Sequence, residues 1–167
     1  MPGSLPAVAD RIAAAIRNFF PSRPVRLLGN GYGGFVALQA VTRHPGLADR
    51  LVLADAGAAF SEPGRQAFRA MAAAVAAKGL QAIADTAVIV AACEALATLD
   101  LRPQLADVRT PVLAVVGELD EATPPAMAYE VVAGLPNAEL TILDGLAHVP
   151  QLQAPQRFLD AVLPFLS

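Results

Sequence analysis

The sequence has few charged residues and few groups suited to metal or redox chemistry. Charged residues occupy 16% of its 167 positions, whereas about 25% is usual in a soluble domain. One cysteine excludes an intrachain disulfide, and two histidines far apart in the chain argue against a dedicated zinc site. The cysteine, Cys93, lies in the apolar helical stretch VAACEALA. We therefore expect a buried structural thiol there rather than a catalytic one.

Long apolar runs and clusters of like charge are also missing. No apolar run approaches the roughly 20 residues that cross a bilayer, because Arg69, Lys78 and Asp85 interrupt the alanine-rich stretch at 67–97. The net charge is −3 and the charges are scattered singly, so neither nucleic acid nor a membrane is an expected partner. The N-terminal stretch lacks the basic start and long apolar centre of a signal peptide, which makes a cytoplasmic location the default expectation.

Short apolar runs alternate with helical patterns along the chain. Apolar residues make up 55% of it, and its length fits one domain over residues 1–167. Strands are predicted at VRLLG, RLVLADA, PVLAVVGELD and AELTILDG. Helices are predicted over 5–20, over 34–43, as two or three pieces over 62–99 broken at Lys78-Gly79, and over PPAMAYEVVAGLP and APQRFLDAVLPFL. The alternation predicts an α/β fold with about four parallel strands and flanking helices.

Polar groups follow three of the predicted strands, at the ends where open α/β sheets bind ligands. The segment GNGYGG at 29–34 follows the first strand and has the strand-turn-helix context of a nucleophile elbow, G-x-S-x-G. Asp120 lies just past the third strand, and His148 lies just past the fourth. Asp55 and Glu118 also lie near strand ends, where they could line the pocket, but we expect surface or turn roles for both.

This order of elbow, acid and histidine resembles the α/β-hydrolase family. The segment DLRPQLADVRTPVLAVVGELDEATPP, followed by GLAHVPQLQAP, is similar to the C-terminal half of the subgroup that contains 3-oxoadipate enol-lactonases, esterases and C–C bond hydrolases, and GNGYGG is similar to its GNSxGG. The resemblance implies a partial α/β-hydrolase fold with Gly31 at the nucleophile position, Asp120 as acid and His148 as base. It also implies that the Tyr32 backbone N–H contributes to the oxyanion hole, that the substrate is a small ester or lactone, and that no cofactor or metal takes part.

Two departures from the family pattern shape the functional expectation. Glycine at position 31 has no group that can attack a carbonyl, and the neighbouring Tyr32 phenol, with a pKa near 10, is a poor substitute at neutral pH. Loss of a triad serine leaves only about 10³- to 10⁴-fold catalysis over water. In addition, the family's N-terminal strands have no counterpart ahead of residue 1, and the helical lid at about 61–100 is shortened. We therefore expect little or no esterase activity from this chain alone.

Several alternatives remain open at this stage. Asp120 could be a turn or cap residue, His148 an ordinary loop histidine, and His44 a structural residue at a helix C-terminus. Without the family's neighbouring strand, the elbow strand would expose an apolar edge that a second copy, a complementary chain or a local helix should cover. A non-catalytic assembly subunit, one half of a split hydrolase, and an engineered or truncated variant are alternative interpretations. A further alternative is direct activation of water by His148 and Asp120.

Overall fold

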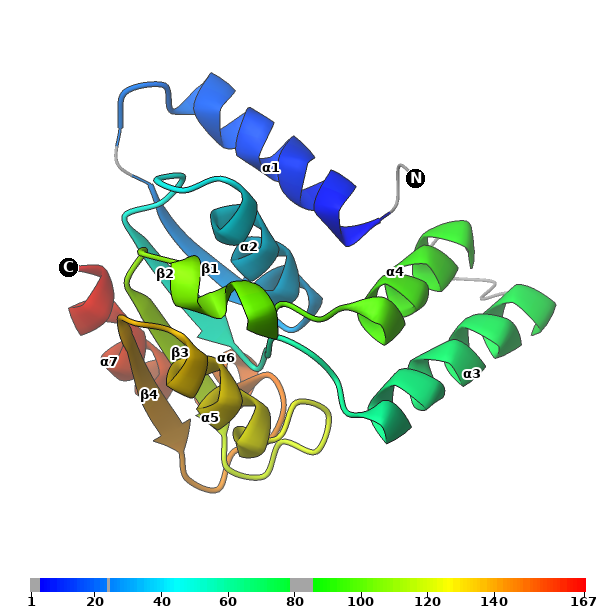
Figure 1. Ribbon diagram of the computed structural model, residues 1–167. Helices are drawn as coiled ribbons and strands as arrows, with labels where there is room; N and C mark the ends of the chain where they lie inside the picture. Colours follow the sequence, from blue (N-terminus) through cyan, green and yellow to red (C-terminus); the bar gives the residue numbers. More distant parts are fainter. Residues whose placement is uncertain (1–3, 24, 79–85) are drawn as a thin grey trace.

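A parallel sheet forms the centre of the protein. The structure is a computed structural model, and it describes residues 4–23, 25–78 and 86–167. Within these residues the sheet has four strands in chain order (Figure 1). The strands are β1 (Arg26–Asn30), β2 (Arg50–Ala54), β3 (Val112–Gly117) and β4 (Ala138–Leu143). Each pairs in parallel with the next, which confirms the predicted α/β class and strand positions.

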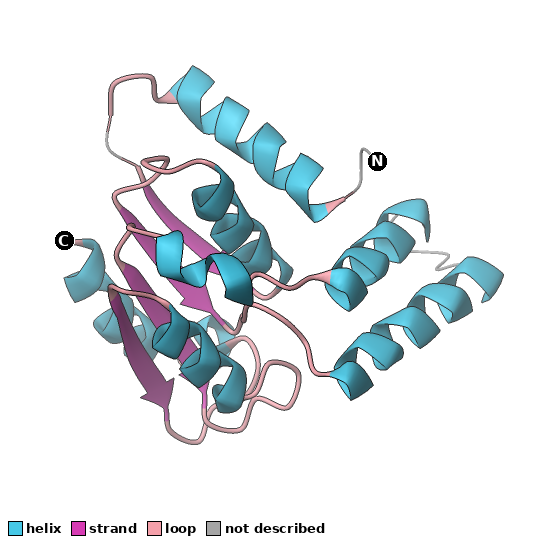
Figure 2. Cartoon of the chain, viewed as in Figure 1, coloured by secondary structure: helices cyan, strands magenta, loops and turns pink. Residues whose placement is uncertain are grey.

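Helices return the chain between the strands and cover the sheet on both faces (Figures 1 and 2). One layer holds α1 (Leu5–Phe19), α2 (Tyr32–Arg43), the 3₁₀-helix η1 (Arg102–Asp107) and α5 (Pro125–Gly134). The other face is covered by α7 (Pro155–Leu166), which follows the short α6 (Pro150–Gln153). The helices α2, α5 and α7 match the predictions, although α2 begins two residues earlier than expected, whereas η1 and α6 were not predicted.

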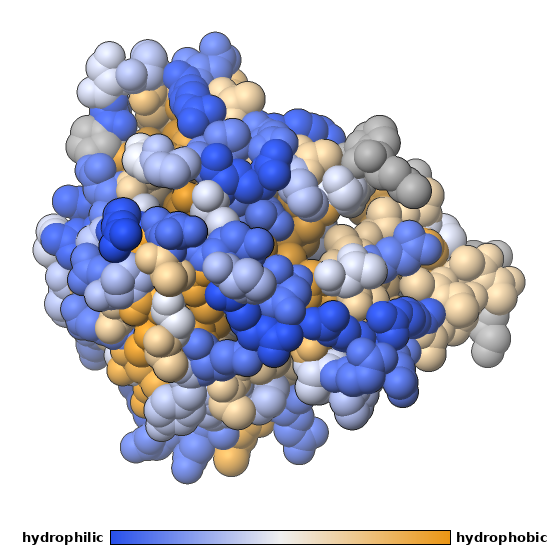
Figure 3. Space-filling model, in the orientation of Figure 1, coloured by the Kyte–Doolittle hydropathy of each residue, from blue (hydrophilic) through white to orange (hydrophobic). Residues whose placement is uncertain are grey.

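Two further helices project from the body of the domain. They are α3 (Glu62–Lys78) and α4 (Thr86–Thr98), which pack against each other in the region predicted as a helical lid. The predicted break includes Gly79, which lies outside the described residues. Cys93 is buried in α4, as expected, and burial raises the pKa of its thiol. Figure 3 shows pale apolar surface over this helical pair, where Met71 and Val88 are exposed.

The two central strands are buried on both faces, because successive side chains point to opposite sides. On one face, Leu51 and Leu53 of β2 join a large cluster with residues of α2, η1 and α5. On the other face, Val52 and Ala54 pack with Phe158 and Val162 of α7. This pattern confirms the prediction that apolar strand runs are covered twice. The edge strands β1 and β4 depart from it, since each retains exposed positions.

Strand β1 has an unpaired edge in the described part of the chain. The Gly31 N–H donates to the Ala54 carbonyl, 2.9 Å away. Because backbone groups alternate in direction along a strand, the N–H and C=O of Leu28 and Asn30 then point away from β2. The Leu28 side chain lies on the same face as its register partner Val52 but is 47% exposed. The expected apolar edge is therefore present.

Helix α1 packs on α2 through buried alanines of both helices, and an ion-pair cluster lies at the margin of this contact. Arg43 and His44 at the C-terminal end of α2 both contact the Asp10 carboxylate of α1, each at 2.8 Å. Hydrogen bonds from Arg43 first, and then from His44, lower the pKa of Asp10 to about 2. His44 thus has the structural position expected from the sequence. Among the described residues, no helix combines the length and apolar character required to span a membrane.

The connection from β1 to α2 depends on a close approach of two backbone segments. A Cβ placed on Gly29 would lie 2.4 Å from the Gly33 carbonyl oxygen, and one placed on Gly34 would lie 2.5 Å from Ala56 Cβ. Backbone atoms cannot move aside as a flexible side chain can. Glycine at position 29 therefore allows α2 to start directly behind the end of β1.

We predict that Gly29→Ala lowers the free energy of unfolding by about 3 kcal/mol or more, because the new methyl group must displace the backbone of α2. Gly33→Ala is the matched control, since nothing lies within 4 Å of a Cβ there. Because alanine favours a helix more than glycine does, that control should be neutral or more stable by up to ~1 kcal/mol. Urea denaturation of both variants tests this, and equal costs would contradict the close-approach explanation.

Candidate active site

The turn at Gly31 has the backbone geometry of a nucleophile elbow. Gly31 lies between β1 and α2 with φ 50° and ψ −123°, and its carbonyl accepts the Gly34 N–H at 2.9 Å. Positive φ of this kind is strained for residues with a side chain, and the elbow motif tolerates it to expose its nucleophile. A Cβ at Gly31 would lie 3.6 Å from His148 Nε2, which is an ordinary contact distance. A side chain at this position would thus face the histidine.

Asp120 and His148 form a hydrogen-bonded acid-histidine pair next to the turn. The His148 Nδ1 lies 2.9 Å from Asp120 Oδ2. An ionised carboxylate only accepts hydrogen bonds, so this contact assigns the proton to Nδ1 and leaves Nε2 as an acceptor facing Gly31. The Asp120 side chain is fully buried, whereas that of His148 is 37% exposed. The structure therefore brings together the three side-chain positions proposed from the sequence.

The Asp120 carboxylate also organises the turn before α5. Its Oδ1 accepts the backbone N–H groups of Ala122 and Thr123, at 2.8 and 2.9 Å. Burial acts to raise the pKa of Asp120, but the hydrogen bonds from His148 and Thr123 outweigh it and lower the pKa below its ordinary value. The two interpretations of Asp120, as a turn residue and as the partner of His148, are thus compatible, because Oδ1 accepts the turn N–H groups while Oδ2 remains available to His148.

Tyr32 is the first residue of α2, directly after Gly31. Its position at a helix start leaves its backbone N–H without an intrahelical acceptor, as an oxyanion-hole donor requires. Its side chain is half-buried against the core cluster, and burial raises the pKa of the phenol. Because its pKa is raised, the Tyr32 phenol is an even poorer nucleophile at neutral pH than the phenol of an ordinary tyrosine.

Thr123 is a site residue that the sequence analysis missed. Its hydroxyl donates to Asp120 Oδ2 at 2.7 Å and lies 3.5 Å from His148 Nδ1. Thr123 therefore fixes the Asp120 carboxylate, which in turn orients the His148 ring. The spacing Asp120-x-x-Thr123 is a signal that could have identified it, because short polar side chains three residues apart commonly share such a turn.

Asp55 lies in the turn after β2, but it contradicts the expectation of a surface role. It follows β2, has no exposed surface and has a positive φ of 49°. Burial is the main cause that raises the pKa of its carboxyl to about 6, and the nearby charge of Asp120 adds to the effect. Surface placement was wrong because the sequence does not reveal that the loop carrying His148 covers this strand end. Glu118, in contrast, is exposed and accepts the Gly145 N–H in a turn, as expected.

The ligand atoms of Asp55, Asp120 and His148 lie within 4.8 Å of one another, so among the described residues this group could hold a metal ion. Asp120, however, already accepts four hydrogen bonds, from Ala122, His148 and two groups of Thr123. These bonds use the lone pairs that a metal would need. The geometry thus favours an acid-histidine pair over a metal centre.

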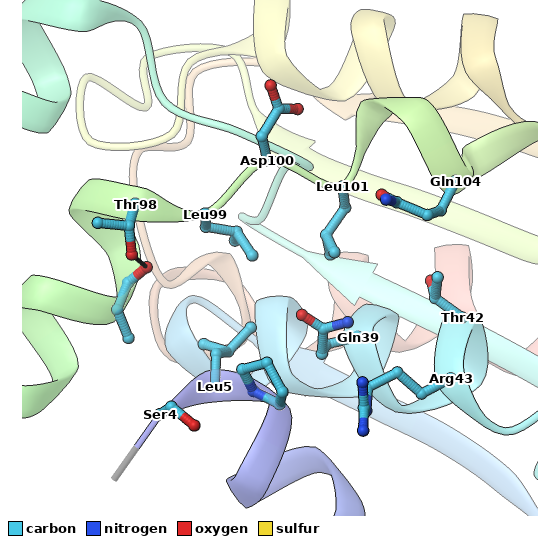
Figure 4. A pocket seen from close by; sticks show the side chains of 12 residues that line it. Ser4, Leu5, Gln39, Thr42, Arg43, Thr98, Leu99, Asp100, Leu101 and Gln104 are labelled. Atoms are coloured by element: carbon cyan, nitrogen blue, oxygen red, sulfur yellow. Dashed lines mark hydrogen bonds between the residues drawn. The ribbon is translucent and has the colours of Figure 1, made fainter. Parts of the chain in front are cut away.

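A separate cavity of about 440 Å³ lies among α1, α2, α4 and η1 (Figure 4). Gln39 and Arg43 line it from the C-terminal half of α2, and Leu5 and Leu101 from the adjoining elements. The elbow, by comparison, lies at the N-terminal end of α2. The cavity and the acid-histidine pair are therefore at opposite ends of that helix.

The chain belongs to the alpha/beta hydrolase family, whose model matches residues 2–161. It is 32% identical over 81 residues to a pimeloyl-[acyl-carrier protein] methyl ester esterase of Yersinia enterocolitica, covering 48% of this chain and 31% of that enzyme. It is 36% identical over 70 residues to 3-oxoadipate enol-lactonase 2 of Acinetobacter baylyi, covering 42% and 26%. The matched segments thus span about a third or less of these relatives.

Solved structures show the same fold over nearly the whole chain. A thermophilic esterase from Thermogutta terrifontis superposes with a TM-score of 0.84 at 20% identity, covering 98% of this chain and 72% of the esterase. A hydrolase from Pseudomonas aeruginosa PA01 gives a TM-score of 0.82 at 22% identity, covering 98% and 72%. At these identities the likeness establishes the fold, and it confirms the partial α/β-hydrolase architecture expected from the motifs.

We predict that Asp55 makes the stability of the fold depend on pH. The pKa of Asp55 in the fold, about 6, exceeds that of the unfolded chain. The fold favours the protonated carboxyl, so the contribution of Asp55 to the free energy of unfolding is complete below about pH 4 and is lost as the pH rises through about 6. At ~1.4 kcal/mol per unit of pKa difference, the unchanged chain should lose about 3 kcal/mol relative to Asp55→Asn over this range. Urea denaturation of both proteins from pH 4 to pH 7 measures the difference, and parallel curves would refute the prediction.

Proposed function

We propose that this chain descends from a carboxylic ester or lactone hydrolase and that it hydrolyses such substrates poorly, if at all, on its own. One observation carries the proposal. The acid-histidine pair is fully assembled, with 2.9 Å between His148 Nδ1 and Asp120 Oδ2, yet the position that Nε2 faces is Gly31, where a Cβ would lie 3.6 Å away. In this proposal His148 would be the base, and the position of the nucleophile that it would activate has no side chain.

The proposed chemistry is acyl transfer when a hydroxymethyl group is restored at position 31. The hydroxyl oxygen would attack the substrate carbonyl carbon while His148 Nε2 accepts its proton. Asp120 would stabilise the imidazolium, and the Tyr32 N–H would donate to the developing oxyanion. His148 would then return the proton to the departing alkoxide. In the second half of the reaction, water would attack the acyl group while His148 accepts its proton, and the proton would return to the hydroxyl oxygen at position 31 as the acid leaves. The similarity to an esterase and to a lactonase supports this substrate class.

We predict that Gly31→Ser gains hydrolysis of short p-nitrophenyl esters, at least ~10³-fold above the unchanged chain. Gly31→Ala is the matched control, because it adds the Cβ without a hydroxyl group. Adding His148→Ala to Gly31→Ser should remove the gain, since nothing would then accept the hydroxyl proton. Initial rates and labelling by a fluorophosphonate probe measure these effects.

Two results would count against the proposal. If Gly31→Ser is folded but neither turns over ester nor reacts with the probe, the site is not competent in this chain. If the unchanged chain turns over ester at an appreciable rate that His148→Ala abolishes, the direct water mechanism applies instead, with His148 as base and the space at Gly31 available for water.

A second candidate function is that of an assembly subunit or one half of a split hydrolase. The unpaired edge of β1 and the 47% exposed Leu28 favour it. Exposed Ile12 and Phe19 on α1 add apolar surface. An apolar edge strand of this kind is a template for pairing with another strand. We propose that a second copy, or a complementary chain, pairs there.

We predict that Leu28→Lys reduces self-association, because a charged side chain at an edge strand opposes pairing. Tyr129→Lys is the matched control, since Tyr129 is 56% exposed on α5, a helix that packs on β3 and β4 instead of β1. Light scattering after size-exclusion chromatography should report an oligomer for the unchanged chain and the control, and a smaller species for Leu28→Lys. A monomer in all three would remove self-pairing and leave only a complementary chain.

A further inference from the structure

The non-glycine residues with a strained backbone in the described chain lie next to each other. Only two of its non-glycine residues have positive φ, Asp55 at 49° and Val149 at 69°. Val149 is β-branched, so this conformation is unusual for it. Val149 directly follows His148, and its N–H donates to Asp55 Oδ2 at 3.3 Å. The two unusual residues are thus bonded to each other, and such strain commonly persists where function requires it.

The Asp55 carboxylate also contacts the neighbours of the other two site residues. Its Oδ2 accepts the side-chain N–H of Asn30 at 3.0 Å, and Asn30 immediately precedes Gly31. Its Oδ1 accepts the backbone N–H of Gly117 at 3.3 Å, at the end of the strand that leads to Asp120. One buried carboxylate therefore joins the ends of β1, β2 and β3 to the histidine loop.

Gly117 explains why the histidine loop can approach this carboxylate. A Cβ on Gly117 would lie 2.4 Å from the Ala147 carbonyl oxygen, so the loop passes directly over the end of β3. The same passage buries Asp55 beneath the loop and places the Val149 N–H within reach. Asp120 orients the His148 ring, whereas Asp55 accepts the backbone N–H directly after it.

From these contacts we propose that Asp55 is a positioning residue, whose carboxylate fixes the backbone around Gly31, Asp120 and His148 and so sets the separation between the histidine and position 31. The inference deepens the proposed function and rests on it. Both carboxylate oxygens are needed, because the donors arrive from two sides. An amide of the same shape offers one acceptor and turns an N–H₂ group toward the remaining donors.

The test uses Asp55→Asn, which keeps the shape, and Asp55→Gly, which removes the carboxylate and relieves the strained φ. Glu118→Gln is the matched control, because Glu118 also accepts a loop N–H near a strand end, that of Gly145. In the otherwise unchanged chain, NMR should show displaced His148 ring signals and faster amide exchange at Val149 in both Asp55 variants. The His44 ring signals serve as an internal reference, and the Glu118→Gln spectrum should match that of the parent at His148.

Kinetics in the Gly31→Ser background provide the second measurement. A positioning role predicts that Asp55→Asn lowers kcat by ~10- to 10²-fold with KM nearly unchanged, whereas Glu118→Gln leaves both constants as they are. Folded Asp55 variants with unaltered His148 signals and Val149 exchange would overturn the proposal. If Gly31→Ser itself is inactive, the proposed function fails, but the NMR result still decides whether Asp55 positions the histidine loop.

Discussion

The parallel pairing of four strands is the constraint on which the site depends. Parallel pairing sends the carboxyl ends of β1, β2 and β3 to one edge of the sheet, so the turns that follow them must meet there. Gly31, Asp55 and Asp120 occupy these turns, and the loop after β4 brings His148 across them. A change in strand order would separate these residues without altering any of them.

The histidine pair at this edge is stabilised by interactions that do not involve position 31. Asp120 receives hydrogen bonds from its own turn as well as from His148, and these compensate for its burial. The arrangement can therefore persist with glycine at the elbow, because the fold needs the carboxylate to be satisfied and does not need a hydroxyl group opposite Nε2. This separation between structural and chemical requirements explains how an acid-histidine pair can remain assembled opposite a glycine.

The same sheet leaves its β1 edge without a neighbouring strand among the described residues. Central strands β2 and β3 are buried on both faces, whereas β1 carries the elbow and is also an edge strand. The strand that positions Gly31 therefore has backbone groups and an exposed Leu28 available for pairing. A partner on this edge would lie next to the elbow.

The sequence by itself determined the order of the strands and of the longer helices, the parallel sheet, the elbow turn and the candidates Asp120 and His148, because these depend on local periodicity, glycine-rich turns and motif spacing. Only the tertiary structure decided that Asp55 is buried, that Thr123 supports Asp120, and that Val149 bonds to a carboxylate far away in the chain. Those features arise where the loop carrying His148 folds over the ends of other strands. Burial and hydrogen bonding between distant segments leave no periodic signal in the sequence, so they could not be read from it.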